Sequence, residues 1–195
     1  YPMEEAYTLN QPNTKFPSHT DRKLTPGVDL TTGSLGQGVS TATGAALGNR
    51  IDGRDNYVYC VIGDGEADEG QVWEGFHFAY AHKLDNIIYF IDNNGYQLDG
   101  TTAEVLDHGD IAKKVAGFGL HTQEIDGHDV KAIYEAIQKA KETKGVPSCI
   151  VLDTSKGKGA TFAEPKHDHS SQPKEEQWQE AIAASEKALE ELKKG

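Results

Sequence analysis

The sequence predicts an α/β fold of three layers, in which a mostly parallel β-sheet has helices on both faces. Three apolar runs, Tyr57–Ile62, Ile87–Ile91 and Ser148–Leu152, have the length and β-branched content of strands that are buried on both faces. Helix-length segments alternate with these runs, which favours parallel strand pairing. A chain of 195 residues is long enough for one domain of this kind and hardly for two.

The elements and their boundaries follow from local composition. Residues 1–30 contain four of the seven prolines and little hydrophobic periodicity, which predicts an irregular segment. Gly33–Gly38 then leads into a helix over Val39–Asn49, whose small residues allow close packing on a sheet. We expect residues 31–173 to form the α/β domain and residues 174–195 an amphipathic C-terminal helix.

Two further helices are predicted inside the domain. Glu66, Asp68 and Glu69 are expected in the first turn of one of them, which continues with an apolar stripe typical of core or a subunit interface. Asp129 is placed to cap the other, over Val130–Thr143. We therefore interpret the motif Asp126-Gly127-His128-Asp129 as architecture.

Composition excludes several functional classes. A formal charge of −12 and a pI near 5.0 argue against nucleic acid and anionic membranes as partners, because both select for basic surfaces. No apolar run approaches the roughly 20 residues of a membrane-spanning helix. Cys60 and Cys149 lie inside predicted strands, so we expect buried thiols in a reduced compartment and a cytoplasmic protein.

Polar side chains follow two of the predicted strands. Gly63-Asp64-Gly65 comes after the first run, and Asn93-Asn94-Gly95 comes after the second. The carboxyl ends of parallel strands meet at one edge of a sheet, where α/β proteins bind ligands. Asp and Asn supply hard oxygen ligands, and the glycines let a diphosphate approach the backbone, which predicts a magnesium-diphosphate site. The alternative for Asn-Asn-Gly is a plain type I′ turn.

These motifs together resemble those of a known family. Asn94 follows Asp64 by 30 residues (94 − 64), a spacing similar to that of the thiamine diphosphate motif. The sequences QLDG (97–100), TGSLGQG (32–38) and TSKGKG (154–159) narrow the resemblance to transketolases, and in particular to the N-terminal subunit of split transketolases. The resemblance extends from about Phe16 to Trp178.

The resemblance implies a cofactor and the residues that bind it. Thiamine diphosphate is expected together with Mg²⁺, for which Ca²⁺ or Mn²⁺ can substitute. The expected metal ligands are the side chains of Asp64 and Asn94 and the backbone carbonyl of Tyr96. The expected cofactor contacts are Gly33, Ser34 and Leu35 near the rings, and Gly63, Asp64, Gly65, Glu66, Asn94, Lys156 and His169 around the diphosphate.

The resemblance also implies catalytic residues. His19 lies 14 residues before Gly33, where the family has a histidine that contacts the donor ketose, although Ser18 and Thr20 replace its flanking Gly and Pro. His169 takes the place of the histidine in a Trp-His-Gly motif, with Asp168 and Ser170 as its neighbours here. Glu69 is expected at the subunit boundary, near the partner's activating glutamate.

The activity expected from the resemblance is transfer of a two-carbon ketol unit from a ketose (phosphate) to an aldose (phosphate). The activating glutamate belongs to a pyrimidine-binding domain that these residues do not include. We therefore expect the chain to be inactive alone and to form a heterotetramer with a subunit carrying the pyrimidine-binding and C-terminal domains. From the resemblance, we also expect the family's first helices to be missing from residues 1–30. The alternatives are a deoxyxylulose-phosphate-synthase-like or 2-oxo acid dehydrogenase-like subunit, or a non-catalytic cofactor-binding module.

Overall fold

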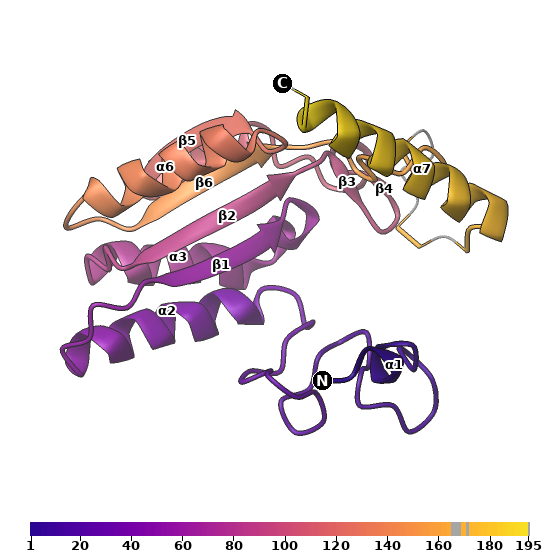
Figure 1. Cartoon of the computed structure of the whole chain (residues 1–195). Coiled ribbons are helices and arrows are strands. Elements are labelled where there is room, and N and C mark those ends of the chain that lie inside the picture. The colour runs from indigo at the N-terminus through magenta and orange to yellow at the C-terminus, as the bar shows by residue number, and fades with distance from the viewer. Residues whose placement is uncertain (165–168, 171, 195) are drawn as a thin grey trace.

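The computed structural model of the chain describes residues 1–164, 169–170 and 172–194. Its centre is a four-stranded parallel sheet in the order β1-β2-β6-β5 (Figure 1). The strands are β1 (Val58–Gly63), β2 (Ile87–Asn93), β5 (His121–Asp126) and β6 (Ser148–Asp153). A short antiparallel pair, β3 (Tyr96–Gln97) and β4 (Gly100–Thr101), follows β2.

Helices cover both faces of the sheet, which confirms the predicted three-layer α/β fold. The helices α2 (Gln37–Ile51), α3 (Gly70–Ala81) and α5 (Ile111–Gly117) share one buried cluster with the sheet, and α6 (Val130–Glu142) packs on the other face. The remaining helices are α1 (Met3–Ala6), α4 (Thr102–Val105) and α7 (Glu175–Leu192), with a 3₁₀ turn over Gly65–Asp68. Within residues 1–30, only the four residues of α1 are helical.

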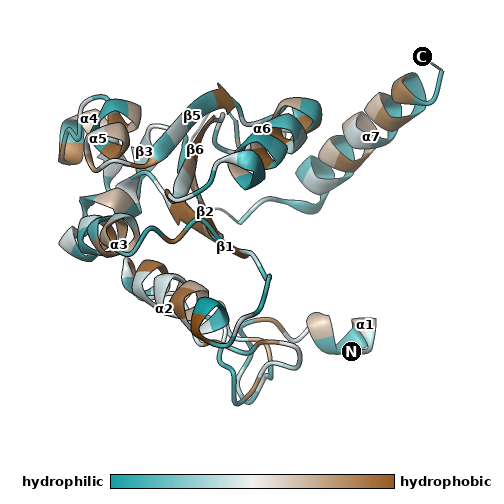
Figure 2. Ribbon diagram, turned by 90° about the vertical axis from the view of Figure 1, so that its left-hand side faces the viewer, coloured by the Kyte–Doolittle hydropathy of each residue, from teal (hydrophilic) through white to brown (hydrophobic). Residues whose placement is uncertain are grey.

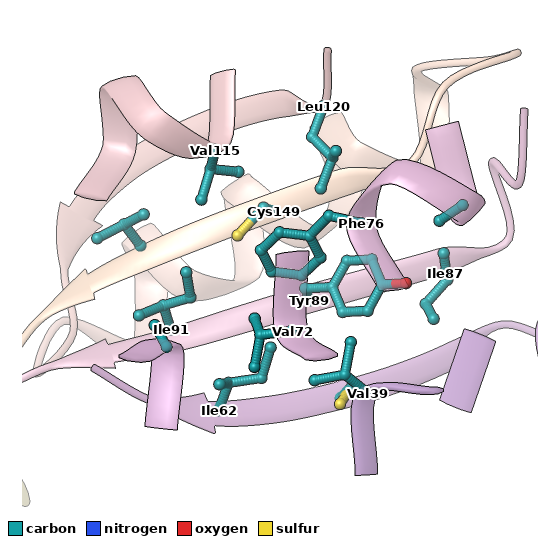
Figure 3. Packing of buried hydrophobic residues seen from close by; sticks show 14 of the residues in the cluster. Val39, Ile62, Val72, Phe76, Ile87, Tyr89, Ile91, Val115, Leu120 and Cys149 are labelled. Carbon is teal, nitrogen blue, oxygen red and sulfur yellow. The ribbon is translucent and has the colours of Figure 1, made fainter. Parts of the chain in front are cut away.

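The larger core cluster fixes α2 and α3 against β1 and β2 (Figure 3). Phe76 of α3 and Tyr89 of β2 are fully buried, and their ring centroids lie 4.8 Å apart. The Tyr89 hydroxyl lies 2.7 Å from Thr43 Oγ1 of α2, so its polar atom has a partner inside the core. Burying side chains of this size contributes about 1.5–3 kcal/mol each. This packing places the loops after β1 and β2 side by side.

The three predicted strands agree with β1, β2 and β6 to within two residues at each end. The predicted position of the acidic residues is wrong. Glu66 and Asp68 lie in the separate 3₁₀ turn, and α3 begins at Gly70. The physical reason is that Glu69 has an extended backbone (φ −74°, ψ 123°), which separates the two helical segments. The strand β5 and the helix α5 are not predicted from the sequence.

The two cysteines are buried free thiols, as predicted. Burial raises the pKa of the Cys60 thiol to about 11 and raises the pKa of Cys149 further. Both groups therefore remain protonated at neutral pH.

The sheet face opposite the larger core cluster, which α6 covers over β6 and β5, is covered less completely at β1. Tyr59 and Val61, which lie outside the larger core cluster, are 48% and 71% exposed. The prediction that Tyr57–Ile62 is buried on both faces is therefore wrong, because β1 is an edge strand of the sheet. Helix α7 projects from the body (Figure 2). Ala181 is its one buried residue in the described part of the chain. Among the described residues, no helix is long and apolar enough to span a membrane.

Candidate functional site

Asp64 joins the loops that follow β1 and β2. Its side chain is almost fully buried, with 1% of the residue exposed. One carboxylate oxygen accepts a hydrogen bond from Gly65 N at 2.8 Å, and the other accepts one from Gly95 N at 2.6 Å. Burial raises the pKa of Asp64, and the hydrogen bonds from the Gly95 and Gly65 N–H groups partly offset this effect. The arrangement orients a carboxylate between the two glycine turns.

Asn94 and Tyr96 lie in the turn that Asp64 contacts. The side-chain oxygen of Asn94 accepts a hydrogen bond from Tyr96 N at 3.0 Å. A type I′ turn needs positive φ at both central residues. Gly95 has φ +75°, whereas Asn94 is not among the described residues with positive φ. The plain I′ alternative is therefore wrong, and the Asn94 oxygen turns toward the backbone of the same loop.

The residues of these loops fit a hard cation and its bound water. One carboxylate, one amide oxygen and backbone carbonyls suit Mg²⁺, which retains several waters. Among the described residues, no cluster of three or more His, Cys, Asp or Glu side chains could hold a metal ion, and the expected ligand set includes only one such side chain, that of Asp64. Gln97 supports the fit, because its Oε1 is buried and has no hydrogen-bond partner within the described residues. It lies beside Gly65, where a Cβ would come within 2.6 Å of Gln97 Cβ.

Glu66 connects the Asp64 turn to the glycine-rich loop before α2. Its two carboxylate oxygens accept hydrogen bonds from Gly36 N at 2.8 Å and from Gly63 N at 3.3 Å. Glu69 is exposed, and its Cβ lies 3.1 Å from where a Cβ on Gly36 would be. Gly36 has φ +77°, so both its conformation and its contact with Glu69 favour glycine. Thus Glu66 orients two loops through their backbones.

His19 lies against the loop that contains Gly33, Ser34 and Leu35. The imidazole occupies the space where a Cβ on Gly33 would project, and Gly33 has φ +120°. The residue after His19 also contacts the segment before Gly33, because the Thr20 carbonyl accepts a hydrogen bond from Thr32 N at 3.4 Å. The structure therefore brings together His19 and the Gly33–Leu35 backbone. Their catalytic and cofactor-binding roles remain predictions.

Two clefts adjoin at the carboxyl end of β1. One, of about 430 Å³, lies between the loop 32–35, α2 and β1. The other, of about 420 Å³, is lined by Asn94, His128, Lys156 and neighbouring residues. Val61 lines both clefts, so they share a wall. Together they suit an elongated ligand, with polar groups at the Asn94 and Lys156 end and the Gly33–Leu35 backbone at the other.

Lys156 lies in the loop after β6. Thr154 N donates to the Asn93 carbonyl at 3.3 Å, and the Thr154 hydroxyl donates to the Asp92 carboxylate. Ser155 N donates to His128 Nε2 at 2.8 Å. These contacts attach the loop to the end of β2 and to the turn before α6.

The predicted role of His169 remains a prediction. His169 is exposed and is separated from Lys156 by residues that include 165–168. Its sequence neighbours His167 and Asp168 lie outside the described residues.

His108, which no sequence motif indicates, is 9% exposed. Its Nδ1 lies 3.0 Å from the Gly109 carbonyl oxygen, and its positive charge would lower the pKa of Asp64. The sequence gives no signal for this histidine, because it approaches Asp64 only through the path of the chain after β4. Gln97 and His128 were likewise not assigned to the site.

Comparison with known proteins agrees with this geometry. The family model described as "Transketolase, thiamine diphosphate binding domain" matches residues 1–189. The 6-deoxy-6-sulfo-D-fructose transketolase subunit SqwG of Clostridium sp. is 47% identical over 96% of this chain and 68% of that protein. An apulose-4-phosphate transketolase subunit of Actinobacillus succinogenes is 35% identical over 98% of this chain and 67% of that protein.

A solved structure extends the likeness to three dimensions. The transketolase of Campylobacter jejuni has a TM-score of 0.78 and 32% identity, with 84% of this chain covering 27% of that one. The chain therefore spans about two thirds of the length of the subunit relatives and about a quarter of the Campylobacter jejuni transketolase chain.

Proposed function

Because this chain belongs to the transketolase family, matching its thiamine diphosphate-binding domain, we propose that it is the diphosphate- and Mg²⁺-binding subunit of a split transketolase. The complete enzyme transfers a two-carbon ketol unit from a ketose to an aldose. The observation that carries the proposal is the buried Asp64 carboxylate, which accepts hydrogen bonds from the Gly65 and Gly95 N–H groups. It thereby joins the loops after β1 and β2, which border the two adjoining clefts.

Each residue of the site has a task in this proposal. Asp64, Asn94 and the Tyr96 carbonyl bind Mg²⁺, and Lys156 pairs with the diphosphate as a point charge. When bound, thiamine diphosphate supplies the stabilised carbanion that this reaction needs. His19 and His169 bind substrate and move protons, roles in which an imidazole can act as donor or acceptor. Glu69 contributes at the boundary with the partner subunit.

The partner supplies the glutamate that activates the cofactor. Two relatives named as subunits support a split arrangement, and their names point to a ketose with a sulfonate or a phosphate group as substrate class. We propose a heterotetramer that contains two copies of each subunit, in which this chain binds cofactor but has no activity alone. A 2-oxo acid dehydrogenase-like subunit is the second candidate within the same cofactor class, and the motif QLDG after Asn94 favours a transketolase.

Asp64→Ala tests the metal site. The substitution removes the one charged metal ligand, so we expect affinity for thiamine diphosphate at millimolar Mg²⁺ to fall by at least about 100-fold. Isothermal titration calorimetry measures this in the full chain, with Asp55→Ala as the control, because Asp55 is exposed before the amino end of β1. Unchanged cofactor affinity in Asp64→Ala would overturn the metal assignment.

Coexpression with a candidate partner tests the reaction. Ketol transfer should occur only when both chains, thiamine diphosphate and Mg²⁺ are present, across a panel of ketose phosphates and sulfonates. Activity of this chain alone would contradict the split-enzyme proposal. Decarboxylation of a 2-oxo acid without ketol transfer would favour the second candidate.

A further inference from the structure

We propose that His128 is a positioning residue, which fixes the loop after β6 so that the Lys156 ammonium group faces the diphosphate end of the cleft. The inference rests on the proposed function, because it needs a diphosphate for Lys156 to bind. It also changes the interpretation of the motif Asp126-Gly127-His128-Asp129, which the sequence indicates only as architecture.

The other three residues of this motif already have separate structural partners. Asp126 Oδ1 accepts a hydrogen bond from His128 N at 2.8 Å and so shapes the turn. Gly127 N donates to the Asp153 carbonyl at 2.9 Å, and a Cβ at Gly127 would collide with Thr154. Asp129 caps α6 by accepting hydrogen bonds from Lys131 N and Ala132 N. The imidazole of His128 is required by none of these contacts.

That imidazole contacts the residue directly before Lys156. His128 Nε2 accepts the Ser155 N–H at 2.8 Å, and both His128 and Lys156 line the cleft that contains Asn94. An acceptor at Nε2 requires a lone pair there, so the proton of the neutral ring is on Nδ1. A lysine or arginine at position 128 has no acceptor and could not make this bond.

The hydrogen bond between Ser155 N and His128 Nε2 restricts the loop backbone directly before Lys156. Thr154 is attached to β2 through Asn93 and Asp92, and Lys158 N donates to the Ser155 carbonyl at 3.1 Å. The Ser155 N–H would otherwise face solvent, because Ser155 is exposed. Fixing the backbone on both sides of Ser155 sets the direction in which the next side chain leaves the loop. Lys156, which is half-buried in the cleft, is that side chain.

A double-mutant cycle in the full chain tests the inference. The probes are inorganic diphosphate and thiamine diphosphate, each titrated calorimetrically with Mg²⁺ present. We expect Lys156→Met to weaken binding by about 10-fold or more, as loss of a charged hydrogen-bonding partner does. His128→Ala should weaken it by about 5-fold in the wild-type background and by less than about 2-fold in the Lys156→Met background.

Two readouts separate positioning from a general structural role. His128→Gln keeps an acceptor at similar reach, so its affinity should stay within about 2-fold of wild type. Exchange of the Ser155 amide hydrogen, measured by NMR without any ligand, should be faster in His128→Ala and unchanged in His128→Gln. Melting temperatures of both variants should remain within a few degrees of wild type, since His128 is exposed.

Each contrary outcome has a distinct meaning. Equal losses from His128→Ala in both backgrounds, or no loss in the wild-type background, would overturn the positioning role and leave the proposed function intact. A Lys156→Met variant that binds both probes normally would also overturn it, because Lys156 would then not face the diphosphate. A wild-type chain that binds neither probe would overturn the proposed function and this inference together.

Discussion

Individual carboxylates in this site differ in what they do, although they lie close together in the sequence. Asp64 is buried between two glycine turns, Glu66 joins two backbones, and Glu69 is exposed at the start of α3. Acidic side chains beside a diphosphate repel it, so an acidic residue at such a site is expected to have a different, structural role. For Glu66, the structure supplies one, because its oxygens satisfy the Gly36 and Gly63 N–H groups.

Glu66→Ala should therefore destabilise the chain, whereas Glu69→Ala should not. Loss of the Glu66 carboxylate leaves the N–H groups of Gly36 and Gly63 without their partner, at a cost of about 1–2 kcal/mol. Glu69 makes no side-chain cap hydrogen bond, so its removal should change the free energy of unfolding by less than about 0.5 kcal/mol. Urea denaturation of both variants measures the difference, and equal stability of the two would show that Glu66 does not join the loops.

The buried thiols make stability depend on alkaline pH. The pKa of Cys60 is raised to about 11 in the folded chain, so its contribution is complete below the unfolded pKa of about 9 and is lost as pH rises through 11. At pH 10 this loss is roughly 1 kcal/mol. Denaturant unfolding at pH 8 and pH 10 should show a smaller decrease for Cys60→Ala than for wild type. An identical decrease in both proteins would contradict a buried, protonated Cys60.

Two glycines in the paired helices α2 and α3 illustrate packing at the scale of elements. Gly75 faces Val39, whose Cγ1 would lie 2.6 Å from an added Cβ, and Val39 is fully buried. Gly44 lies on the exposed side of α2 and has nothing within 4 Å of an added Cβ. The same substitution should therefore have opposite effects at these two positions.

Gly75→Ala should destabilise the chain by about 1–3 kcal/mol, because overpacking displaces Val39. Gly44→Ala should stabilise it by up to about 1 kcal/mol, because alanine is the better helix former and the site is open. Thermal unfolding followed by circular dichroism at 222 nm measures both changes. If Gly75→Ala raises the melting temperature as Gly44→Ala does, helices α2 and α3 do not make the close contact at Gly75.

The sequence predicts those elements whose signal is local. Continuous apolar runs mark β2 and β6, because strands at the centre of a parallel sheet are buried on both faces. The run in β1 is also apolar, but β1 lies at the sheet edge and only one of its faces is buried. The other edge strand, β5, was missed because its side chains are only partly buried and include Gln123 and Glu124. The break at Glu69 was also missed, since acidic residues favour a first helical turn and their sequence does not indicate where the helix begins.

In the site, too, the sequence predicts only those features that have a local signal. The spacing of Asp64 and Asn94 is visible because both follow strands, and the structure joins their loops through Asp64 and Gly95. His108, Gln97 and the contact between His128 and Ser155 were not predicted, because they depend on how loops from different strands meet. No local pattern contains that information.

At the scale of the whole molecule, the described structure has a well-packed body and a helix that contributes little to it. Helix α7 has apolar residues along one face, yet Trp178, Ile182, Leu189 and Leu192 are 48%, 47%, 52% and 79% exposed. Its described aromatic contact is the T-shaped pair of Trp178 with Phe162, at 5.2 Å between centroids. A pair of this kind contributes about 0.5–1.5 kcal/mol.

Deleting residues 174–195 should therefore lower the free energy of unfolding by only about 1 kcal/mol, a shift of roughly 2–4 °C in melting temperature. The chain's other tryptophan provides the contrast. Trp73 donates from Nε1 to the Ala67 carbonyl at 2.8 Å and packs edge-on against Phe76, so Trp73→Ala should cost about 3 kcal/mol or more. Differential scanning calorimetry of the two variants measures both effects. If the deletion destabilises the chain as much as Trp73→Ala, then α7 packs as part of the core in solution.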